Sequence, residues 1–385
     1  MAGTPTTVAS SAALDHLRWA LTPEVGPTRF SRLVERFGSA GAALGATAGQ
    51  IERIDGIGAA TAQQIAAGRD RADVQGEVEL AAAKGVRIIC PQDEEYPPGL
   101  KQISDPPICL YVKGQIARQD AVALGIVGSR RCTIYGREQA RRFGQQVGGR
   151  GLTVVSGLAR GIDGEAHKGA LEAGGRTIAV LGNGLSTLYP PEHAELAEQI
   201  SRAGAVISEL PMTTSPDAKN FLPRNRVIAG LSLGVLVIEA ARRSGSLTTA
   251  RLAGEYNREV FAVPGRIDSE FSQGTNALIR DQHAKLAGCI DDIIDELGEV
   301  GDALKDVVPE VDVEDSLLAA ATARLNEEER QILEALDRQG QSLEAIADGT
   351  GQPPGRVASL LVTLQLKGLA RQLPGNQFVR AGGRP

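Results

Sequence analysis

The sequence predicts an α/β fold, an extended Rossmann-like doubly wound parallel sheet with a helical module before it and a winged helix after it. Short apolar runs typical of buried parallel strands alternate with helix-length segments through the middle of the chain. Several of these runs end in glycine-rich turns, which is where doubly wound sheets bind their ligands. An acidic segment then separates this region from a final stretch with mixed helix and strand patterns.

Composition limits the classes of function. The chain has 385 residues, enough for two or three domains, and its formal net charge is −6. This acidic balance argues against bulk electrostatic coating of nucleic acid, so a nucleic-acid site requires a local concentration of arginine and lysine. The sequence has no apolar run long enough to span a bilayer and no secretory leader pattern, so we expect a cytoplasmic protein with no membrane association.

The four cysteines are scattered without CxxC spacing or neighbouring histidines, so the sequence predicts neither a metal site nor a disulfide framework. No cofactor-binding fingerprint is present either, because neither of the two main glycine-rich turns matches GxGxxG. We therefore expect no metal and no cofactor.

Residues 1–72 read as an N-terminal helix-hairpin-helix (SAM-like) module. Apolar positions between residues 12 and 37 suit two short helices broken at Gly26-Pro27, and Gly56-Ile57-Gly58 separates two further helical segments. Backbone amides of such a hairpin can hold a DNA phosphate. Here no lysine or arginine follows the hairpin before Arg69, which favours a structural or partner-binding role.

Residues 73–297 read as the extended Rossmann-like domain. A helix at 73–84 and extended segments at 86–90 and 106–112 precede the main strands and add a strand or two to the sheet. The predicted main strands are 124–127, 153–155, 176–181, 205–208, 234–239 and 259–263. The helices predicted between and after them are 135–150, a helix opened by Tyr189-Pro190-Pro191-Glu192 and ending near 201, 250–256, and a short acidic helix at 291–297.

Two turns of this domain predict a phosphate-binding surface. Glycine lets backbone amides approach an anion, and an arginine can bind phosphate through two hydrogen bonds. In the alternative reading the glycines only tighten the turns, Asp163 caps its helix and His167 packs beneath the turn. The first turn contributes Gly128, Ser129 and Arg130, and the second contributes Ser156, Gly157, Arg160, Gly161 and Asp163.

Two further segments add candidate contacts. Ser244, Gly245, Ser246 and Thr248 precede the helix at 250–256 and offer hydroxyl and amide donors to an anion. Residues 219–226 read as a loop in which Phe221 can stack on a base beside the cations Lys219, Arg224 and Arg226. The alternative for Phe221 is an ordinary core position.

The end of the chain reads as an acidic linker at 298–322 and a winged-helix domain at 323–385. Predicted helices at 326–340, 343–349 and 354–367 are followed by strands at 369–372 and 377–380. The expected recognition helix has Arg356 as its main cation. One main cation neutralises few DNA phosphates. This favours a protein-contact or auxiliary role.

Several motifs occur in a consistent order over about residues 96–292. They read YPPGLKQISDPPICLYVKG, SGLARGIDGEAHKGAL, FLPRNRVIAGLS, EAARRSGSLTTA and VFAVPG. This series resembles the DNA-processing protein A (DprA/Smf) family. The resemblance implies a dimeric protein without established catalytic activity that binds single-stranded DNA, protects it and loads RecA recombinase in natural transformation or recombination.

The same resemblance implies particular contacts. The two turns would bind phosphate, Lys219 and Phe221 would lie at a base pocket, and Arg224, Asn225 and Arg226 match an RNR motif. The homodimer surface would fall near 271–288, where Gln282 and His283 replace more usual small residues. Pro191 stands where many relatives have a lysine, which would weaken one phosphate contact.

Two other functions stay open at this point. A nucleotide-phosphate N-glycosidase would use Glu239 as general acid/base beside the 244–248 turn, although the chain lacks a PGGxGT-type glycine run. A transcription factor would bind duplex DNA specifically through residues 323–380 alone, which the acidic balance disfavours.

Overall fold

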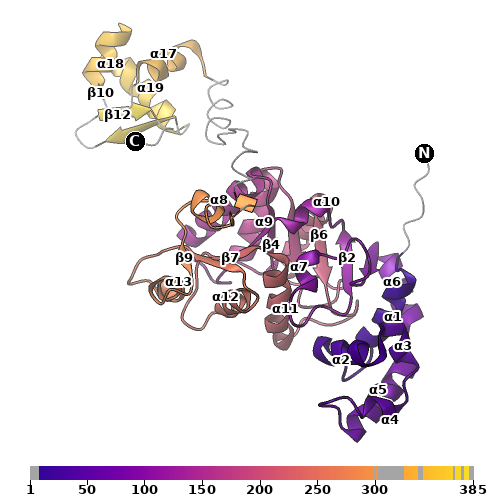
Figure 1. Cartoon of the computed structure of the whole chain (residues 1–385). Helices are drawn as coiled ribbons and strands as arrows, with labels where there is room; N and C mark the ends of the chain where they lie inside the picture. Colours follow the sequence, from indigo (N-terminus) through magenta and orange to yellow (C-terminus); the bar gives the residue numbers. More distant parts are fainter. Residues whose placement is uncertain are drawn as a thin grey trace. The chain divides into compact units, whose positions relative to one another are not determined.

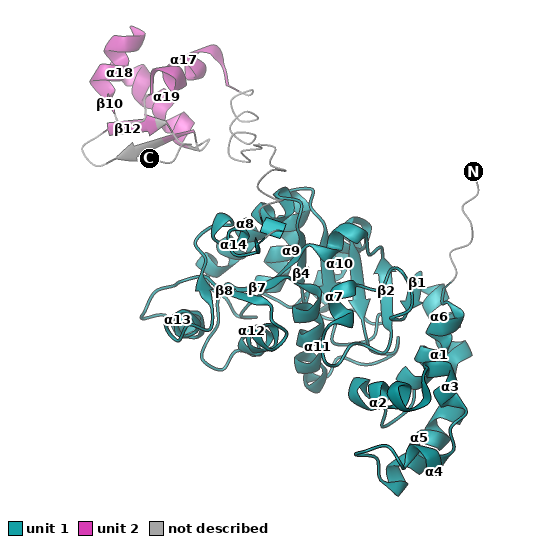
Figure 2. Ribbon diagram, viewed as in Figure 1, with its two compact units in different colours: residues 1–307 teal, residues 308–385 magenta. Residues whose placement is uncertain are grey.

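The computed structural model describes residues 8–298, 300–301, 325–336, 341–366, 369–373 and 377–380. The chain divides into two compact units, Met1–Val307 and Val308–Pro385, which Figure 2 colours separately. The predicted linker at 298–322 lies almost entirely outside the described residues.

The N-terminal module is a small bundle of short helices. Its break at Gly26-Pro27 is confirmed, since Gly26 is the N-cap of the second helix and Pro27 its first residue. The side chains of Trp19, Leu33 and Ile65 are fully buried in its core. The helices are α1 (Ser11–Ala20), α2 (Pro27–Phe37), α3 (Ala40–Leu44), α4 (Ala48–Ile51) and α5 (Ala59–Arg71).

The central domain is built on a nine-stranded sheet of order β1-β2-β6-β5-β4-β3-β7-β8-β9. From β6 to β9 neighbouring strands are parallel, whereas β1 and β2 are antiparallel additions at one edge. The doubly wound sheet with added strands is therefore confirmed. The strands are β1 (Val86–Ile89), β2 (Leu110–Gly114), β3 (Ala123–Val127), β4 (Thr153–Ser156), β5 (Thr177–Val180), β6 (Ala205–Ser208), β7 (Gly234–Val237), β8 (Glu259–Ala262) and β9 (Lys285–Leu286).

Helices cover both faces of this sheet, because its strands are apolar on both sides. Figure 1 shows α8, α9 and α10 on one side and α7, α11 and α12 on the other. One core therefore packs Phe143 and Ile162 on Ile126, and the other packs Val227 on Val127 and Val155. The helices are α6 (Val74–Ala83), α7 (Pro98–Lys101), α8 (Ile134–Gly149), α9 (Ile162–Glu172), α10 (Ala194–Ala203), α11 (Ala218–Leu231), α12 (Gly245–Glu255), α13 (Gln273–Arg280) and α14 (Asp291–Ile294), with short 3₁₀ helices η1 (Arg118–Ala121), η2 (Pro191–His193) and η3 (Glu270–Ser272).

Two differences from the sequence prediction bear on the site. The segment 219–226 is not a loop but the start of α11, because the Asp217 side chain caps the helix by accepting a 3.0 Å bond from the Lys219 amide. Pro223 lies inside this helix. The helix predicted at 250–256 begins earlier, at Gly245, with Ser244 as its N-cap.

The strand order fixes where the candidate turns meet. After β3 the chain adds β4, β5 and β6 on one side, and it then crosses back to add β7, β8 and β9 on the other. The carboxyl ends of these parallel strands share one edge of the sheet. The turns that follow β3, β4, β5 and β7 are therefore neighbours at the switch point.

The second unit is a winged helix, as predicted. Ile332, Val357 and Leu361 are buried in its core. Arg356 at the start of the recognition helix is ion-paired with Glu328. The elements are α17 (Glu327–Ala335), β10 (Gln341–Ser342), α18 (Leu343–Thr350), α19 (Pro354–Leu366), β11 (Ala370–Leu373) and β12 (Gln377–Arg380), with sheet order β10-β12-β11.

Throughout the described ranges, the helices are too short or too polar to cross a bilayer.

Candidate nucleic-acid interface

The glycines of the first two turns bring those turns into contact. A Cβ on Gly128 would lie 2.5 Å from Cγ1 of Ile162, and one on Gly161 would lie 2.5 Å from the Ser129 carbonyl oxygen. Gly161 also has φ +77°, a conformation that favours glycine. The Ile162 amide donates to the Ser129 carbonyl at 3.3 Å. These glycines therefore set the turns after β3 and β4 side by side.

The second turn is organised around Asp163. Its carboxylate accepts hydrogen bonds from the amides of Gly157, at 3.2 Å, and Ala159, at 3.4 Å. Burial raises the pKa of this carboxyl. The N-cap of α9 is Gly161 and not Asp163, which lies in the first turn of the helix. The Gly157 amide, which was expected to face a phosphate, is thus already bonded to Asp163.

His167 packs beneath the same turn. Its side chain is fully buried, and its Nδ1 lies 2.6 Å from Oγ1 of Thr177. Burial lowers the pKa of His167 to about 3, so the ring is neutral at physiological pH. This residue supports the turn from inside the domain.

The first turn is held by Glu239, which follows β7. The Ser129 amide donates to the Glu239 carbonyl at 2.8 Å. The Glu239 carboxylate accepts from the amide of Thr133, at 2.9 Å, and from its hydroxyl, at 2.6 Å. Glu239 is 2 % exposed, so its carboxylate ties β7 to the start of α8. Ser156 is buried, and its hydroxyl donates to the Ile126 carbonyl.

The third turn is also bonded internally. Ser244 caps α12, accepting from the Ser246 amide at 3.4 Å, and the two hydroxyl oxygens lie 2.8 Å apart. The Asn225 side chain donates to the Gly245 carbonyl at 3.3 Å. Ser246 is buried and Thr248 is half-buried. The hydroxyl of this turn therefore serves first to cap α12.

The structure places Arg224 inside the protein. Its guanidinium donates to the carbonyl oxygens of Gly157, at 2.7 Å, and Val180. Gly157 makes room for it, since a Cβ there would lie 2.2 Å from Nη1 of Arg224. Burial lowers the pKa of Arg224 to about 10, which leaves it charged at neutral pH. Its charge lies beneath the surface and close to Asp163.

Arg226 is buried as well, in an acidic surrounding. It is ion-paired with Glu209, and its Nε lies 3.3 Å from an oxygen of Asp105. Burial raises the pKa of Glu209, while Arg226 acts in the opposite direction. With Asn225 also buried, the RNR motif faces the interior. Sequence reasoning missed this because the acidic partners lie far away along the chain.

Two arginines lie against two aromatic rings at the switch-point edge, and we call these four accessible side chains the arginine–aromatic cluster: Arg130, Arg160, Tyr189 and Phe221. The guanidinium carbon of Arg130 lies 4.7 Å from the centre of the Phe221 ring, and that of Arg160 lies 5.7 Å from the Tyr189 ring. The two ring centres are 5.9 Å apart. Their residues come from the turns after β3 and β4, the segment before η2, and the first turns of α11.

Two buried groups support the cluster from below. A Cβ on Gly182, after β5, would lie 2.8 Å from Cδ1 of Phe221, so the ring rests on the backbone at the end of that strand. The guanidinium carbon of Arg224 lies 6.0 Å from the centre of the same ring. Lys219, on α11 before Phe221, has a side chain that is 78 % exposed and lies 3.2 Å from Asp217.

The sequence reasoning overlooked several accessible groups. Tyr189 and Glu192 lie in a motif that was read only as a helix start, and Glu192 is ion-paired with Arg160. Arg131, Arg242 and Arg243 are exposed and form no ion pair with another residue in the part of the chain that the structure describes. Their position beside predicted turns is the signal that could have found them.

The cluster combines two kinds of recognition. Exposed guanidinium groups bind phosphate, and accessible aromatic faces stack on planar π systems. Such a surface suits a ligand that carries phosphates and unpaired bases together.

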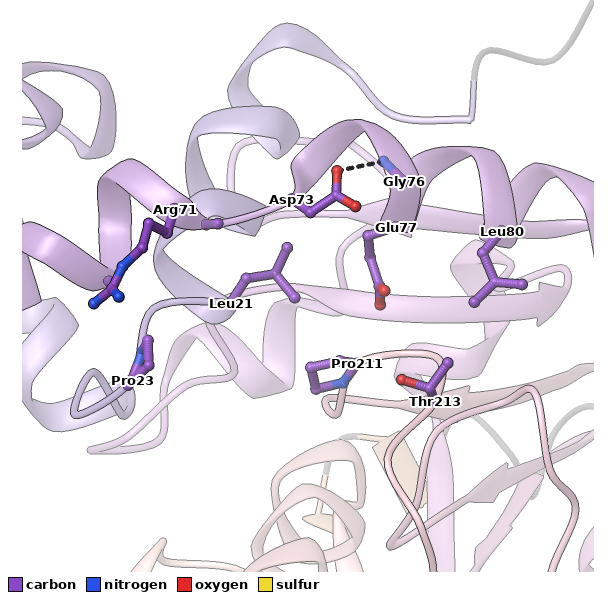
Figure 3. A pocket seen from close by; sticks show the side chains of 11 residues that line it. Leu21, Pro23, Arg71, Asp73, Gly76, Glu77, Leu80, Pro211 and Thr213 are labelled. Atoms are coloured by element: carbon purple, nitrogen blue, oxygen red, sulfur yellow. Dashed lines mark hydrogen bonds between the residues drawn. The ribbon is translucent and has the colours of Figure 1, made fainter.

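A separate hollow of ≈ 520 Å³ lies between the helical module and the central domain (Figure 3). Its two carboxylates are already bonded, because Asp73 accepts from the Gly76 amide at 2.9 Å and Glu77 accepts from the Met212 amide at 2.7 Å. Leu21 and Pro23 form its apolar wall. This hollow marks the joint between α1, α6 and the segment after β6.

The comparisons with known proteins identify the family. A family model described as DNA recombination-mediator protein A matches residues 87–298, more than half of the chain. The chain belongs to this DprA family. A DprA winged-helix model matches residues 317–376, and a DprA-like N-terminal helix-hairpin-helix model matches residues 10–67. The resemblance of the sequence motifs is thereby confirmed.

Individual DprA relatives cover most of the chain. Protein Smf of Escherichia coli K12 is 41% identical over 299 residues, which are 76% of this chain and 77% of that protein. The X-ray structure of DNA processing protein A from Streptococcus pneumoniae aligns with TM-score 0.64 at 32% identity, covering 75% of this chain and 98% of that one.

A third relative bears on ligand type. The structure of DNA processing protein A from Helicobacter pylori, described for its single-stranded DNA binding mode, aligns with TM-score 0.50 at 28% identity. It covers 57% of this chain and 96% of the Helicobacter chain.

Proposed function

We propose that this protein binds single-stranded DNA through the arginine–aromatic cluster, without strong sequence preference, and protects the bound strand in the cytoplasm. The observation that carries the proposal is the exposed Arg130 guanidinium over the Phe221 ring, with centres 4.7 Å apart. One group can bind a phosphate while the other stacks on the adjoining base. The single-stranded DNA binding described for the Helicobacter relative supports the same ligand.

The cluster favours a single strand over a duplex for a physical reason. Base faces are covered by their neighbours in a duplex, whereas a single strand can present unstacked faces to an aromatic ring. Stacking is tolerant of sequence because every base has a π face. Since the whole chain is acidic, the attraction must come from local arginines, and binding should weaken as salt is added.

The direct test is a fluorescence-anisotropy titration of single- and double-stranded oligonucleotides with wild type and Arg130→Ala. We expect a preference for the single strand in wild type and a loss of affinity in the variant that is nearly uniform across sequences. Arg118→Ala is the matched control, because Arg118 is also an exposed arginine. It lies in η1, which precedes β3, and therefore at the edge of the sheet opposite to the arginine–aromatic cluster. Unchanged affinity of Arg130→Ala would overturn the proposal.

We further propose that the role is not catalytic. The N-glycosidase alternative needs Glu239 as general acid/base, yet this carboxylate is buried and bonded to Thr133. Wild type should therefore release no base from nucleoside monophosphates. Hydrolysis that disappears in Glu239→Gln would replace our proposal with the enzymatic one.

Membership of the family suggests a step after DNA binding. We propose that the bound strand is passed to a RecA-type recombinase during transformation or recombination. The test measures recombinase filament formation on single strands coated with single-strand-binding protein. Wild type should accelerate it, and Arg130→Ala should not.

We also propose that the protein acts as a homodimer through the region near 271–288. Strand β9 lies at the open edge of the sheet, and its Leu286 side chain is 52% exposed. Ile267 nearby in sequence is 94% exposed and lines a hollow of ≈ 740 Å³ together with residues of α13. An apolar side chain on an unpaired strand edge is suited to a second copy of the same surface.

A further inference from the structure

We propose that Tyr189 is a second base-stacking residue, so that the cluster binds two nucleobases of one strand. This inference rests on the proposed binding of single-stranded DNA. It assigns a role to a residue that the sequence motifs placed only at a helix start.

The first support is the contact between the two rings. The centres of Tyr189 and Phe221 are 5.9 Å apart and their planes are inclined by 40°. A base inserted between parallel rings would need about 7 Å, twice the stacking distance of about 3.4 Å in DNA. The two rings are closer than that, so a base does not fit between them and each ring would have to stack on a base separately.

The second support is that each ring has an exposed arginine of its own. Arg130 lies over Phe221 and Arg160 lies over Tyr189. Among the described residues no cation–π contact joins Arg130 to Tyr189 or Arg160 to Phe221. The order of accessible groups is therefore Arg160, Tyr189, Phe221, Arg130, with a planar guanidinium at each end of an aromatic pair.

A guanidinium and a nucleobase are both planar groups that stack on aromatic faces. If a base takes the place of each guanidinium, the ring keeps a stacking partner and the released arginine can bind the neighbouring phosphate. Arg130 and Arg160 follow β3 and β4, which are paired strands. The two arginines thus follow one another along the edge of the sheet, as successive phosphates do along a strand.

Tyr189 is accessible enough for this role. Its side chain is half-buried and is not part of the hydrophobic cores, in contrast to Tyr96 and Tyr111, which are 1% and 0% exposed. A tyrosine that served only the core would be enclosed like those two. The ligand class is a dinucleotide step of any sequence within a single strand.

The test compares Tyr189→Ala and Tyr189→Phe on two oligonucleotides of equal length, one of thymidines and one with an abasic sugar-phosphate backbone. Truncating a stacking side chain typically weakens binding by about fivefold to 150-fold per base. We expect such a loss for Tyr189→Ala on the thymidine strand, almost none on the abasic strand, and near wild-type affinity for Tyr189→Phe. Thermal melting of each variant checks that the fold is retained.

Two results would overturn the inference while leaving the proposed function intact. One is unchanged binding of Tyr189→Ala to thymidines when Phe221→Ala binds weakly. The other is an equal loss on both strands, which would mean that Tyr189 acts only by positioning Arg160. Failure of wild type to bind either strand would instead remove the proposed function itself.

Discussion

The guanidinium of Arg160 is ion-paired with the carboxylate of Glu192, and both side chains are about half exposed at the switch-point edge. Arg160 follows β4, and Glu192 lies in η2. The hydrogen bond from Arg160 lowers the pKa of the Glu192 carboxyl, so this residue is ionised at neutral pH. Arg160, which we propose binds a DNA phosphate, is thus already paired with the Glu192 carboxylate. A phosphate that binds Arg160 has to displace this carboxylate.

Removing this competitor should strengthen DNA binding. We expect Glu192→Gln to bind single strands about two- to fivefold more tightly at low salt, since exposed ion pairs are weak. The affinity of Glu192→Gln should also fall more steeply with salt. In wild type, the Glu192 carboxylate that DNA displaces takes up a cation, which offsets one of the cations that DNA releases. The variant lacks this offset, so its slope of log affinity against log salt concentration should be steeper by up to about 0.7. Anisotropy titrations at several salt concentrations measure both quantities.

Two controls separate competition from a general charge effect. Glu195→Gln changes the net charge equally on the neighbouring α10. In an Arg160→Ala background, Glu192→Gln should have no effect. An equal gain in either control would show that Glu192 repels DNA only through its charge.

A second prediction concerns Arg224, which the sequence assigns to DNA and the structure places in the interior. Arg224→Ala should lower the free energy of unfolding by about 2–4 kcal/mol, because it removes the donor to the carbonyls of Gly157 and Val180 and a positive charge close to Asp163. Urea unfolding followed by circular dichroism measures this. Arg130→Ala, at an exposed position, should change it by less than about 0.5 kcal/mol. A stable Arg224→Ala protein that no longer binds DNA would restore the sequence assignment.

A third prediction tests the support beneath the base-stacking ring. Gly182→Ala should displace Phe221, because the added Cβ would lie 2.8 Å from its ring. We expect an affinity loss of about fivefold or more for single strands with a retained fold. Gly149→Ala is the matched control, since a Cβ there meets no atom within 4 Å. In a Phe221→Ala background the Gly182 substitution should have no further effect on affinity, and a full additional loss would contradict this account.

The parts of the fold that the sequence predicted are those that depend on local pattern. The predicted strands 124–127 and 234–239 appear as β3 and β7, and the residues that form these two strands are apolar, as parallel strands buried on both faces require. The turns after β3 and β4 lie side by side, because neighbouring parallel strands end at the same edge of a sheet.

The surroundings of single side chains could not be predicted in the same way. Arg130 and Arg224 look alike in sequence, but one is exposed and the other is buried by Gly157 and Val180, which lie 67 and 44 residues away. The same holds for Tyr189, whose ring contacts Phe221 from a different segment. Long-range packing decided which cations reach the surface.

A fourth prediction concerns the dimer. Leu286→Asp should shift the protein toward monomer in sedimentation-velocity experiments, because a charge on the edge strand opposes pairing with a second copy. Val362→Asp in α19 is a matched control, since Val362 is 54% exposed and Leu286 is 52% exposed. If both variants sediment like wild type, the dimer surface lies elsewhere.

A last prediction uses the buried histidine beneath the second turn. His167 has a pKa of about 3 in the folded protein and an ordinary value of 6.5 when unfolded, because burial disfavours its charged form. The unfolded chain therefore binds the proton first as the pH falls. The stability that depends on neutral His167 is fully present above pH 6.5 and is progressively lost toward pH 3.

Well below the pKa of the unfolded state, His167 alone makes the free energy of unfolding fall by about 1.4 kcal/mol for each pH unit. His167→Asn keeps a polar group beside Thr177 but cannot titrate, so its free energy of unfolding should decline less steeply between about pH 6 and pH 5. Carboxylates and buried His16 contribute equally to both proteins and cancel in the difference. His283→Asn, at an exposed position, is the control for removing a histidine. If the His167→Asn curve is parallel to wild type, His167 is protonated in the folded state as readily as in the unfolded one, and the turn above it is less enclosed than its contacts indicate.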